Sequence, residues 1–221
     1  KSVTDKMRTK ALLTVAAALS AGVIGAQAQV YSVNIVGYVN QELAGGGAFT
    51  AVANPLDDGA NTLDSLFNGV MPDGGTVQFW NGAGFDVATK VPDFLGGWSG
   101  LPGDTELPPG VGVFVSVGAD PVTKTWVGDV LTGDLSNPLP AGFSFKGNQA
   151  PVAGTAGAIG LGDAMAEGDV IQKWNGAGWD AFTKVPEFLG SWSPSEPTVN
   201  VAEGIFVNVA AEGSWDQTFN P

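Results

Sequence analysis

The feature that most constrains this chain is an internal duplication. Residues 77–100 read VQFWNGAGFDVATKVPDFLGGWSG, and residues 171–194 read IQKWNGAGWDAFTKVPEFLGSWSP, so most positions match at an offset of 94. The match resumes where GVFV at 112–115 aligns with GIFV at 204–207. A period this long, present only twice, indicates tandem domains, because solenoids stack several shorter repeats.

The limits of the two repeats follow from a weaker match at their beginnings. VLTGDL at 130–135 resembles VGYV at 36–39, which places the boundary near Gly133. We therefore predict a first repeat at 29–132 and a second at 133–221. A domain of about 95 residues can bury its own core, so the absence of cysteine is no obstacle to a stable fold.

Short strands separated by turns are predicted in both repeats. Runs rich in Val and Phe at 111–117 and 205–209 follow Pro-Pro-Gly or Glu-Gly turns, as strands do. Asn81-Gly82 and Asn175-Gly176 indicate hairpins, because the central residues of a type I′ turn need positive φ. A second Gly two residues later predicts a slightly longer loop in each hairpin.

Helices are predicted to be few and short. The chain has 33 Gly and 14 Pro, and these residues interrupt long helices. Only 62–67 and 161–166 have helical patterns, so the predicted fold class is all-β. Many short strands with regular turns are typical of sandwiches and barrels, and we predict two tandem homologous β-sandwich or barrel-like units.

The N-terminal segment has the pattern of a secretory signal peptide. A short basic stretch precedes an uncharged, mostly apolar run at 11–25, and Ala-Gln-Ala follows at 26–28. The apolar run is shorter than the roughly 20 residues that span a membrane. We expect Met7 to be the initiator, residues 1–28 to be excluded from the fold, and a mature chain near Gln29 that is secreted or held in the cell envelope.

Charge excludes several classes of partner. Residues 29–221 retain five of the nine Lys and Arg and 21 of the 22 Asp and Glu, so their net charge is −16. Nucleic acids and anionic membrane surfaces attract clustered cations, and this chain would be repelled by both. No apolar segment of the mature chain is long enough to span a membrane. The partners that we expect are further copies of the chain, other envelope proteins, or polysaccharide.

Side-chain chemistry argues against an enzyme. The chain has no His and no Cys, which removes Ser-His-Asp and Cys-His catalytic sets and nearly all zinc and copper sites. Asp86 with Asp180 and Asp93 with Glu187 could serve as paired carboxylates for glycoside hydrolysis. The favoured interpretation is structural, because Asp in turns bonds its local backbone.

Calcium is the one ion that the sequence makes plausible. Asp57, Asp58, Asn61 and Asp64 cluster in DDGANTLD, and calcium takes six to eight oxygen ligands. The spacing differs from that of an EF-hand loop. The favoured alternative is a polar turn in which Asn61 caps the predicted helix at 62–67.

Tryptophan is the residue type that suggests a ligand. Six of the seven Trp pair across the repeats: Trp80 with Trp174, Trp98 with Trp192, and Trp126 with Trp215. Such pairing favours packing in two equivalent cores. Trp98 and Trp192 are flanked by Gly, Ser and Pro, and we expect them to be the most exposed of the seven. They are the candidate residues for stacking on a sugar.

Several motifs resemble those of a known group of proteins. They are SVNIVGYVN at 32–40, FTAVANPL at 49–56, WNGAGFD at 80–86, LPPGVGVFVSV at 107–117 and LPAGFSFKG at 139–147. Together they resemble uncharacterised secreted two-repeat β proteins of bacteria of the Verrucomicrobia and Planctomycetes type. The resemblance implies export and residence in the envelope or outside the cell, and it supplies no catalytic residue.

Two function hypotheses remain from the sequence. The first is a non-enzymatic secreted or cell-surface structural protein, self-assembling through an alternating apolar segment at 30–39 that adds to the sheet of a neighbour. The alternative for that segment is pairing within its own domain. The second hypothesis is a carbohydrate-binding module that uses Trp98 and Trp192.

Overall fold

The computed structural model describes residues 35–221, which belong to one compact unit. The predicted signal peptide at 1–28 and the beginning of the predicted strand at 30–39 lie outside the described residues. None of the helices in the described part is both long and apolar enough to cross a membrane.

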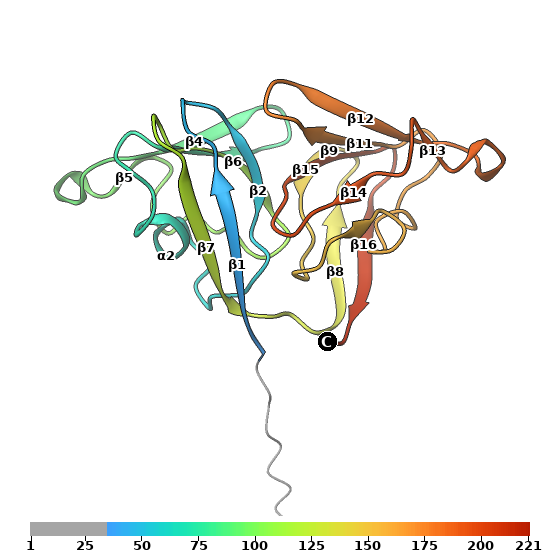
Figure 1. The fold of residues 1–221 in the computed structure, drawn as a ribbon, viewed down its shortest axis with the longest axis horizontal. Coiled ribbons are helices and arrows are strands. Elements are labelled where there is room, and N and C mark those ends of the chain that lie inside the picture. Colours follow the sequence, from blue (N-terminus) through green and yellow to red (C-terminus); the bar gives the residue numbers. More distant parts are fainter. Residues whose placement is uncertain (1–34) are drawn as a thin grey trace, which may run out of the picture. The chain divides into compact units, whose positions relative to one another are not determined.

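The first half of the molecule contains a two-stranded ribbon, a five-stranded antiparallel sheet and one α-helix (Figure 1). In the ribbon, β1 (Val36–Leu43) pairs with β7 (Val122–Asp129). The sheet has the order β2-β6-β3-β4-β5. Its strands are β2 (Thr50–Ala53), β3 (Thr76–Trp80), β4 (Phe85–Lys90), β5 (Trp98–Gly100) and β6 (Gly112–Ser116). A 3-10 turn, η1 (Asp93–Leu95), connects β4 to β5.

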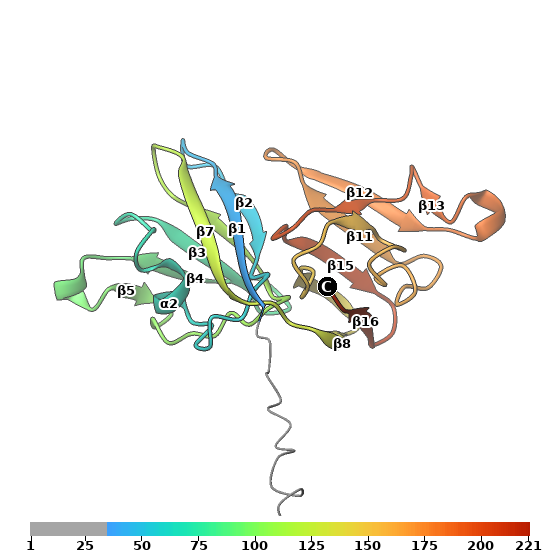
Figure 2. The ribbon, with the colours of Figure 1, turned by 60° about the horizontal axis from the view of Figure 1, so that its bottom comes forward.

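The second half arranges its elements in the same order (Figures 1 and 2). The ribbon pairs β8 (Gly133–Leu139) with β16 (Gly213–Phe219). The five-stranded sheet has the order β9-β15-β11-β12-β13, and η2 (Glu187–Leu189) connects β12 to β13. Its strands are β9 (Gly142–Lys146), β11 (Val170–Trp174), β12 (Trp179–Lys184), β13 (Trp192–Ser193) and β15 (Ile205–Val209). A small extra sheet pairs β10 (Gly154–Thr155) with β14 (Thr198–Val199).

The all-β prediction is confirmed, and the sheets of the described part are open rather than closed into barrels. The hairpin loops are longer than two residues, as predicted, because residues 81–84 separate β3 from β4 and residues 175–178 separate β11 from β12. The predicted helix at 62–67 is α2 (Leu63–Phe67). Its N-cap is Thr62, whose hydroxyl accepts a hydrogen bond from Ser65 N–H, so the prediction of Asn61 as the cap was wrong by one residue.

The second predicted helix, at 161–166, is wrong. These residues form turns, among them a bond of 2.8 Å from Gly162 N–H to the Ala156 carbonyl. Glycine costs about 1 kcal/mol in a helix relative to alanine, and Gly162 is the second residue of this segment, shortly after Gly157 and Gly160. The Gly162 carbonyl accepts a hydrogen bond from Lys184 Nζ. Just before the segment, Trp215 Nε1 donates to the Ile159 carbonyl.

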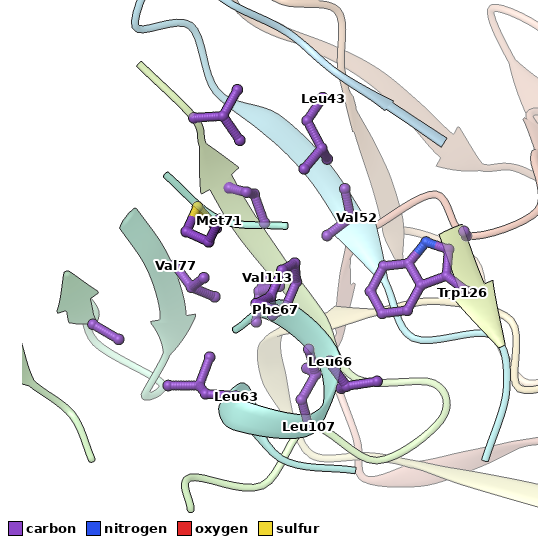
Figure 3. Packing of buried hydrophobic residues seen from close by; sticks show 14 of the residues in the cluster. Leu43, Val52, Leu63, Leu66, Phe67, Met71, Val77, Leu107, Val113 and Trp126 are labelled. Atoms are coloured by element: carbon purple, nitrogen blue, oxygen red, sulfur yellow. The ribbon is translucent and has the colours of Figure 1, made fainter. Parts of the chain in front are cut away.

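Each half has its own hydrophobic core, because each sheet buries one face. In the first half, Phe67 of α2 lies against the Trp126 ring, with centroids 5.7 Å apart in an edge-to-face arrangement (Figure 3). Val77 and Val113 face the same core from the sheet. In the second half, Trp215 is the largest of the fully buried side chains.

The ribbon shows how the N-terminal strand is used within this chain. β1 pairs antiparallel with β7 from Val36 opposite Asp129 to Leu43 opposite Val122. Donation of residues 36–39 to the sheet of another copy would therefore have to break existing pairs. This arrangement matches the alternative of pairing within its own domain.

Lys124 on β7 is a cation buried in the core of the first half, with an exposed fraction of 6%. Its Nζ lies 4.6 Å from the centroid of the Trp126 ring and donates to the Thr125 carbonyl over 3.0 Å. Burial lowers the pKa of Lys124 from 10.5 to about 8, and the charge of Asp58 opposes that shift.

Stability is therefore expected to depend on pH through Lys124. The pKa of Lys124 is 10.5 in the unfolded chain and about 8 in the folded chain. The free energy of unfolding therefore rises as pH rises from 8 to 10.5, and this gain is lost again as pH falls to 8. We expect Lys124→Met to raise the free energy of unfolding at pH 7 by about 1–2 kcal/mol, allowing for solvent screening. Urea unfolding between pH 7 and 10 measures both effects.

The control for this prediction is Lys124→Arg. Arginine keeps its charge throughout that range, so this variant should lose the pH dependence without gaining stability. A Lys124→Met variant that retains the wild-type slope would contradict the assignment.

Candidate functional site

The two tryptophans expected to be exposed are buried. Trp98 is 8% exposed and Trp192 is 5% exposed, so the expectation was wrong. The short strands β5 and β13 turn both rings inward, and Trp98 Nε1 donates to Asp64 Oδ1 over 2.9 Å. A lysine Nζ lies over each ring, Lys90 at 5.8 Å and Lys184 at 5.0 Å from the ring centroid. Sugar stacking needs a free ring face, and neither ring offers one.

The four residues expected to bind calcium make local hydrogen bonds instead. Asp57 and Asp58 each accept a bond from the backbone N–H two residues further on, and Asn61 Nδ2 donates to Asp57 Oδ1. Asp64 is turned away toward Trp98. Within residues 35–221 no group of three or more acidic, His or Cys side chains is placed to hold a metal ion. The calcium prediction is therefore not supported.

The candidate carboxylates for hydrolysis also serve the turns. Asp86 Oδ1 accepts a bond of 3.1 Å from Asn81 Nδ2, and Asp180 Oδ1 accepts one of 3.0 Å from Asn175 Nδ2. Both carboxylates are exposed. Each one closes the base of its own hairpin loop, and this local role accounts for its position.

The most exposed large apolar side chains lie in the two 3-10 turns. Phe94 is 84% exposed and Phe188 is 85% exposed, and the adjacent Leu95 and Leu189 are exposed as well. We call Phe94 and Leu95 the first tip, and Phe188 and Leu189 the second tip. Both tips have the same sequence, Phe-Leu, at equivalent positions of the two repeats.

Backbone geometry holds each tip in a fixed conformation. Pro92 and Pro186 precede the turns, with φ of −50° and −51°. The N–H of Leu95 and that of Leu189 each donate to the preceding proline carbonyl over 2.8 Å. Gly96 and Gly190 end the turns in the left-handed conformation, which favours glycine. The tips are therefore preorganised, so binding through them would cost little conformational entropy.

The two halves meet through aromatic side chains that lie outside the two separate cores. We call this contact the junction. Its buried members are Ala51, Phe114, Phe145 and Phe206, and the partly buried residues packed against them are Phe49, Trp80, Phe85 and Trp174.

The polar contacts of the junction occur in equivalent pairs. Trp80 Nε1 donates to the Phe143 carbonyl over 2.9 Å, and Trp174 Nε1 donates to the Phe49 carbonyl over 2.9 Å. Residues 80 and 174 are separated by 94 positions, and so are residues 49 and 143. This reciprocity is the pattern of a two-fold symmetric interface between two subunits.

Backbone contacts repeat the same pattern. Ala53 N–H donates to the Ala202 carbonyl and Gly147 N–H donates to the Gly110 carbonyl, each over 2.9 Å. Asn137 Nδ2 donates to that Gly110 carbonyl over 2.9 Å. Gln41 Nε2 of β1 makes the equivalent bond to the Ala202 carbonyl over 2.9 Å. At the junction, the two halves are therefore joined by hydrogen bonds that occur in equivalent pairs.

A pocket of about 250 Å³ opens beside the junction. We call it the junction pocket. Its lining residues are Trp80, Phe85, Phe143, Gln172, Trp179 and Phe206. Of these, Phe143 and Trp179 are exposed to solvent, and Gln172 supplies the only polar side chain. The pocket is suited to an apolar group.

Comparison with protein-family models, curated proteins and solved structures finds no match to this chain. Any functional argument therefore rests on the tips, the junction pocket and the surface around them.

The outward faces of the two ribbons differ in polarity. On the first ribbon the exposed side chains include Val36, Tyr38 and Val127. On the second, a depression of about 460 Å³ is lined by Asp134, Leu135, Ser136, Asp216, Gln217 and Thr218. Hydrogen bonds from Ser136 and then Ser214 hold the pKa of Asp216 below its ordinary value. The two ribbon faces therefore suit different neighbours, whereas the two tips are alike.

Sequence reasoning missed both the tips and the junction pocket. A signal for the tips was present, because Phe-Leu lies between a proline and a glycine in both repeats, and such residues mark exposed turns. The signal for the pocket was weaker. In TVQFW of β3, Gln78 and Trp80 share one face, and nothing in a single strand shows that this face meets the other half.

Proposed function

We propose that this chain is a non-enzymatic, exported structural protein that associates with further copies of itself through its two tips. The observation that carries the proposal is the exposure of the same Phe-Leu pair in both halves, with Phe94 at 84% and Phe188 at 85%. Leaving a Phe or Leu side chain in water forgoes about 1.5–3 kcal/mol of burial free energy. Neither Phe-Leu pair packs in a hydrophobic core, so binding of a partner is the role that accounts for their exposure.

Two binding groups on one chain have a further consequence for assembly. A chain with one tip in each half can contact two neighbours, and each contact then helps to retain the other. Rigid apolar groups with low ordering cost suit such repeated weak contacts. Export and residence in the envelope or outside the cell belong to the same proposal, supported by the acidic composition and the N-terminal sequence pattern.

The test is self-association of purified residues 29–221, which contain the whole described unit. We expect the mass measured by light scattering after size exclusion to rise with protein concentration. The double variant Phe94→Ser, Phe188→Ser should need a concentration at least roughly tenfold higher for the same mass, because it lacks both apolar contacts. Circular dichroism of the variant should match that of the wild type, since the tips lie outside the core.

The matched control replaces other exposed apolar side chains, Tyr38→Ser with Val127→Ser on the first ribbon. This control should associate like the wild type. Loss of association in the control but not in the tip variant would assign the contact to the ribbon. A wild-type protein that keeps the mass of a single chain at every concentration would refute the proposal.

A further inference from the structure

The junction brings equivalent positions of the two halves close together. Its hydrogen bonds occur in reciprocal pairs, as in a two-fold interface, and residues near a two-fold axis meet their own equivalents. Identical halves would place identical side chains there. The two halves of this chain differ at two such places, and these differences determine which halves fit together.

The first place holds the ring of Phe145. A methyl group on Gly112 of the first half would lie 2.9 Å from Phe145 Cδ2, and one on Gly204 of the second half would lie 3.0 Å from Phe145 Cε2. Gly112 and Gly204 are equivalent positions, since GVFV aligns with GIFV. The ring therefore lies between two equivalent glycines, in a space that the two halves share.

The first half has no ring to place in that space. Ala51 is its residue at the position of Phe145, because Ala51 pairs with Phe114 in the sheet as Phe145 pairs with Phe206. The Phe145 ring contacts both of those phenylalanines, with centroids 5.0 Å from Phe114 and 4.5 Å from Phe206. The shared space accommodates one ring, and the second half supplies it.

The second place shows the opposite difference. Ala53 of the first half faces Gly147, its equivalent in the second half, and a methyl group on Gly147 would overlap the Ala53 Cβ. Two first halves would therefore bring two methyl groups together and leave the ring space empty. Two second halves would bring two rings into one space. Like halves are disfavoured by overlap or by a cavity, whereas unlike halves fit.

A second copy of the chain can provide the unlike half. Each half has its own core and its own ribbon, and residues 130–132 connect β7 to β8. When this linker leads to the second half of a neighbouring copy, every junction contact forms again between the two copies. A closed copy makes the same contacts with itself, so the balance between the two forms depends on protein concentration.

We propose that the junction face of each half is a binding surface for the unlike half of another copy, and that two copies associate by exchanging halves. The expected product is a closed pair with two junctions. Its selectivity comes from the repulsive contacts that like halves would make. Exchange does not involve the tips, so this contact is separate from the self-association proposed above.

Cross-linking can test the exchange, because the chain has no cysteine of its own. Val111 and Lys146 form an antiparallel bridge between the halves. The bond from Gly147 N–H to the Gly110 carbonyl shows that they are a non-hydrogen-bonded pair, whose Cα atoms lie about 4.5 Å apart, within the range of a disulfide. The double variant Val111→Cys, Lys146→Cys should form this disulfide within one chain and is the positive control.

The test mixes the two single variants, Val111→Cys and Lys146→Cys, in residues 29–221 that also carry Phe94→Ser and Phe188→Ser to remove the tips. The mixture is unfolded in urea, refolded at high protein concentration and oxidised. We expect a covalent pair with one copy of each variant, at least roughly tenfold more abundant than either like pair. Its yield should rise with protein concentration during refolding, because exchange joins two molecules.

The matched control replaces Lys146→Cys by Ser195→Cys, an exposed position of the second half that follows β13, at the sheet edge opposite β9. It should give no mixed pair above the like pairs. An intrachain disulfide in the double variant, without a mixed pair from the single variants, would refute exchange. Like pairs as abundant as the mixed pair would refute the selectivity. Neither result bears on the tips, which are absent from these proteins.

The shared ring space has a test that needs no cysteine. Ala51→Phe adds a second ring and Phe145→Ala removes the first, so each should lower the urea midpoint of unfolding by about 1 M. The double variant Ala51→Phe, Phe145→Ala moves the ring to the first half and should recover at least half of either loss. An Ala51→Phe protein as stable as the wild type would show that two rings fit, and the selectivity for unlike halves would be wrong.

Discussion

Phe206→Ala is expected to lower the free energy of unfolding by about 3–5 kcal/mol, as truncation of a buried phenylalanine does. The Phe206 ring stacks on Phe145 with centroids 4.5 Å apart. It also meets the rings of Trp80 at 5.1 Å and Trp179 at 5.2 Å in edge-to-face contacts. Alanine would remove these contacts and leave a cavity between the two halves.

Urea unfolding monitored by circular dichroism and by tryptophan fluorescence measures this loss. The matched control is Phe188→Ala, the same substitution at a side chain that is 85% exposed, and it should change stability by no more than about 0.5 kcal/mol. Similar losses in the two variants would show that the junction contributes little to stability and would contradict the packing described above.

Gly147→Ala is expected to cost about 2–3 kcal/mol, in the upper range for overpacking. A methyl group on Gly147 would lie 2.1 Å from the Ala53 Cβ and 3.0 Å from the Glu203 carbonyl oxygen. Real Cβ atoms do not approach so closely, so the backbones of the two halves would have to separate. The hydrogen bond from Gly147 N–H to the Gly110 carbonyl would lengthen with them.

Ala53 and Gly147 are equivalent positions of the two repeats, and this provides an internal rescue. The double variant Ala53→Gly, Gly147→Ala moves the single methyl group from one side of the contact to the other. We expect it to recover at least half of the stability lost by Gly147→Ala, because the closest clash is removed. Chemical denaturation of the wild type and of these two variants decides this, and a double variant less stable than Gly147→Ala would contradict the contact.

The parts of the fold that were predictable from sequence depend on neighbours along the chain. The Asn-Gly hairpins at 81 and 175 are set by the φ angles that a tight loop requires. The strands around Phe114 and Phe206 follow from β-branched and aromatic runs after turns. The helix ending at Phe67 also follows from a local pattern, and only its cap was misplaced, by one residue.

The parts that were not predictable depend on residues far apart in sequence. Trp98 was expected to be exposed because small and polar residues flank it, yet its indole N–H is matched by Asp64, 34 positions earlier. The junction pocket combines side chains of both halves, such as Phe85 and Phe206, which no local pattern relates. The Phe-Leu tips had a local signal, but their apolar character favoured a buried position.

The reciprocal contacts of the junction mean that this chain is in effect a dimer whose subunits are joined by a peptide linker. Such an association is intramolecular, so dilution does not dissociate it. In a true homodimer, every substitution occurs in both subunits. Joining the two subunits in one chain removes this restriction. Here Lys146 has Val52 as its equivalent, and Trp179 has Phe85. One half can therefore acquire a cation or a larger ring while the other half does not, and a single fold gains two unlike faces.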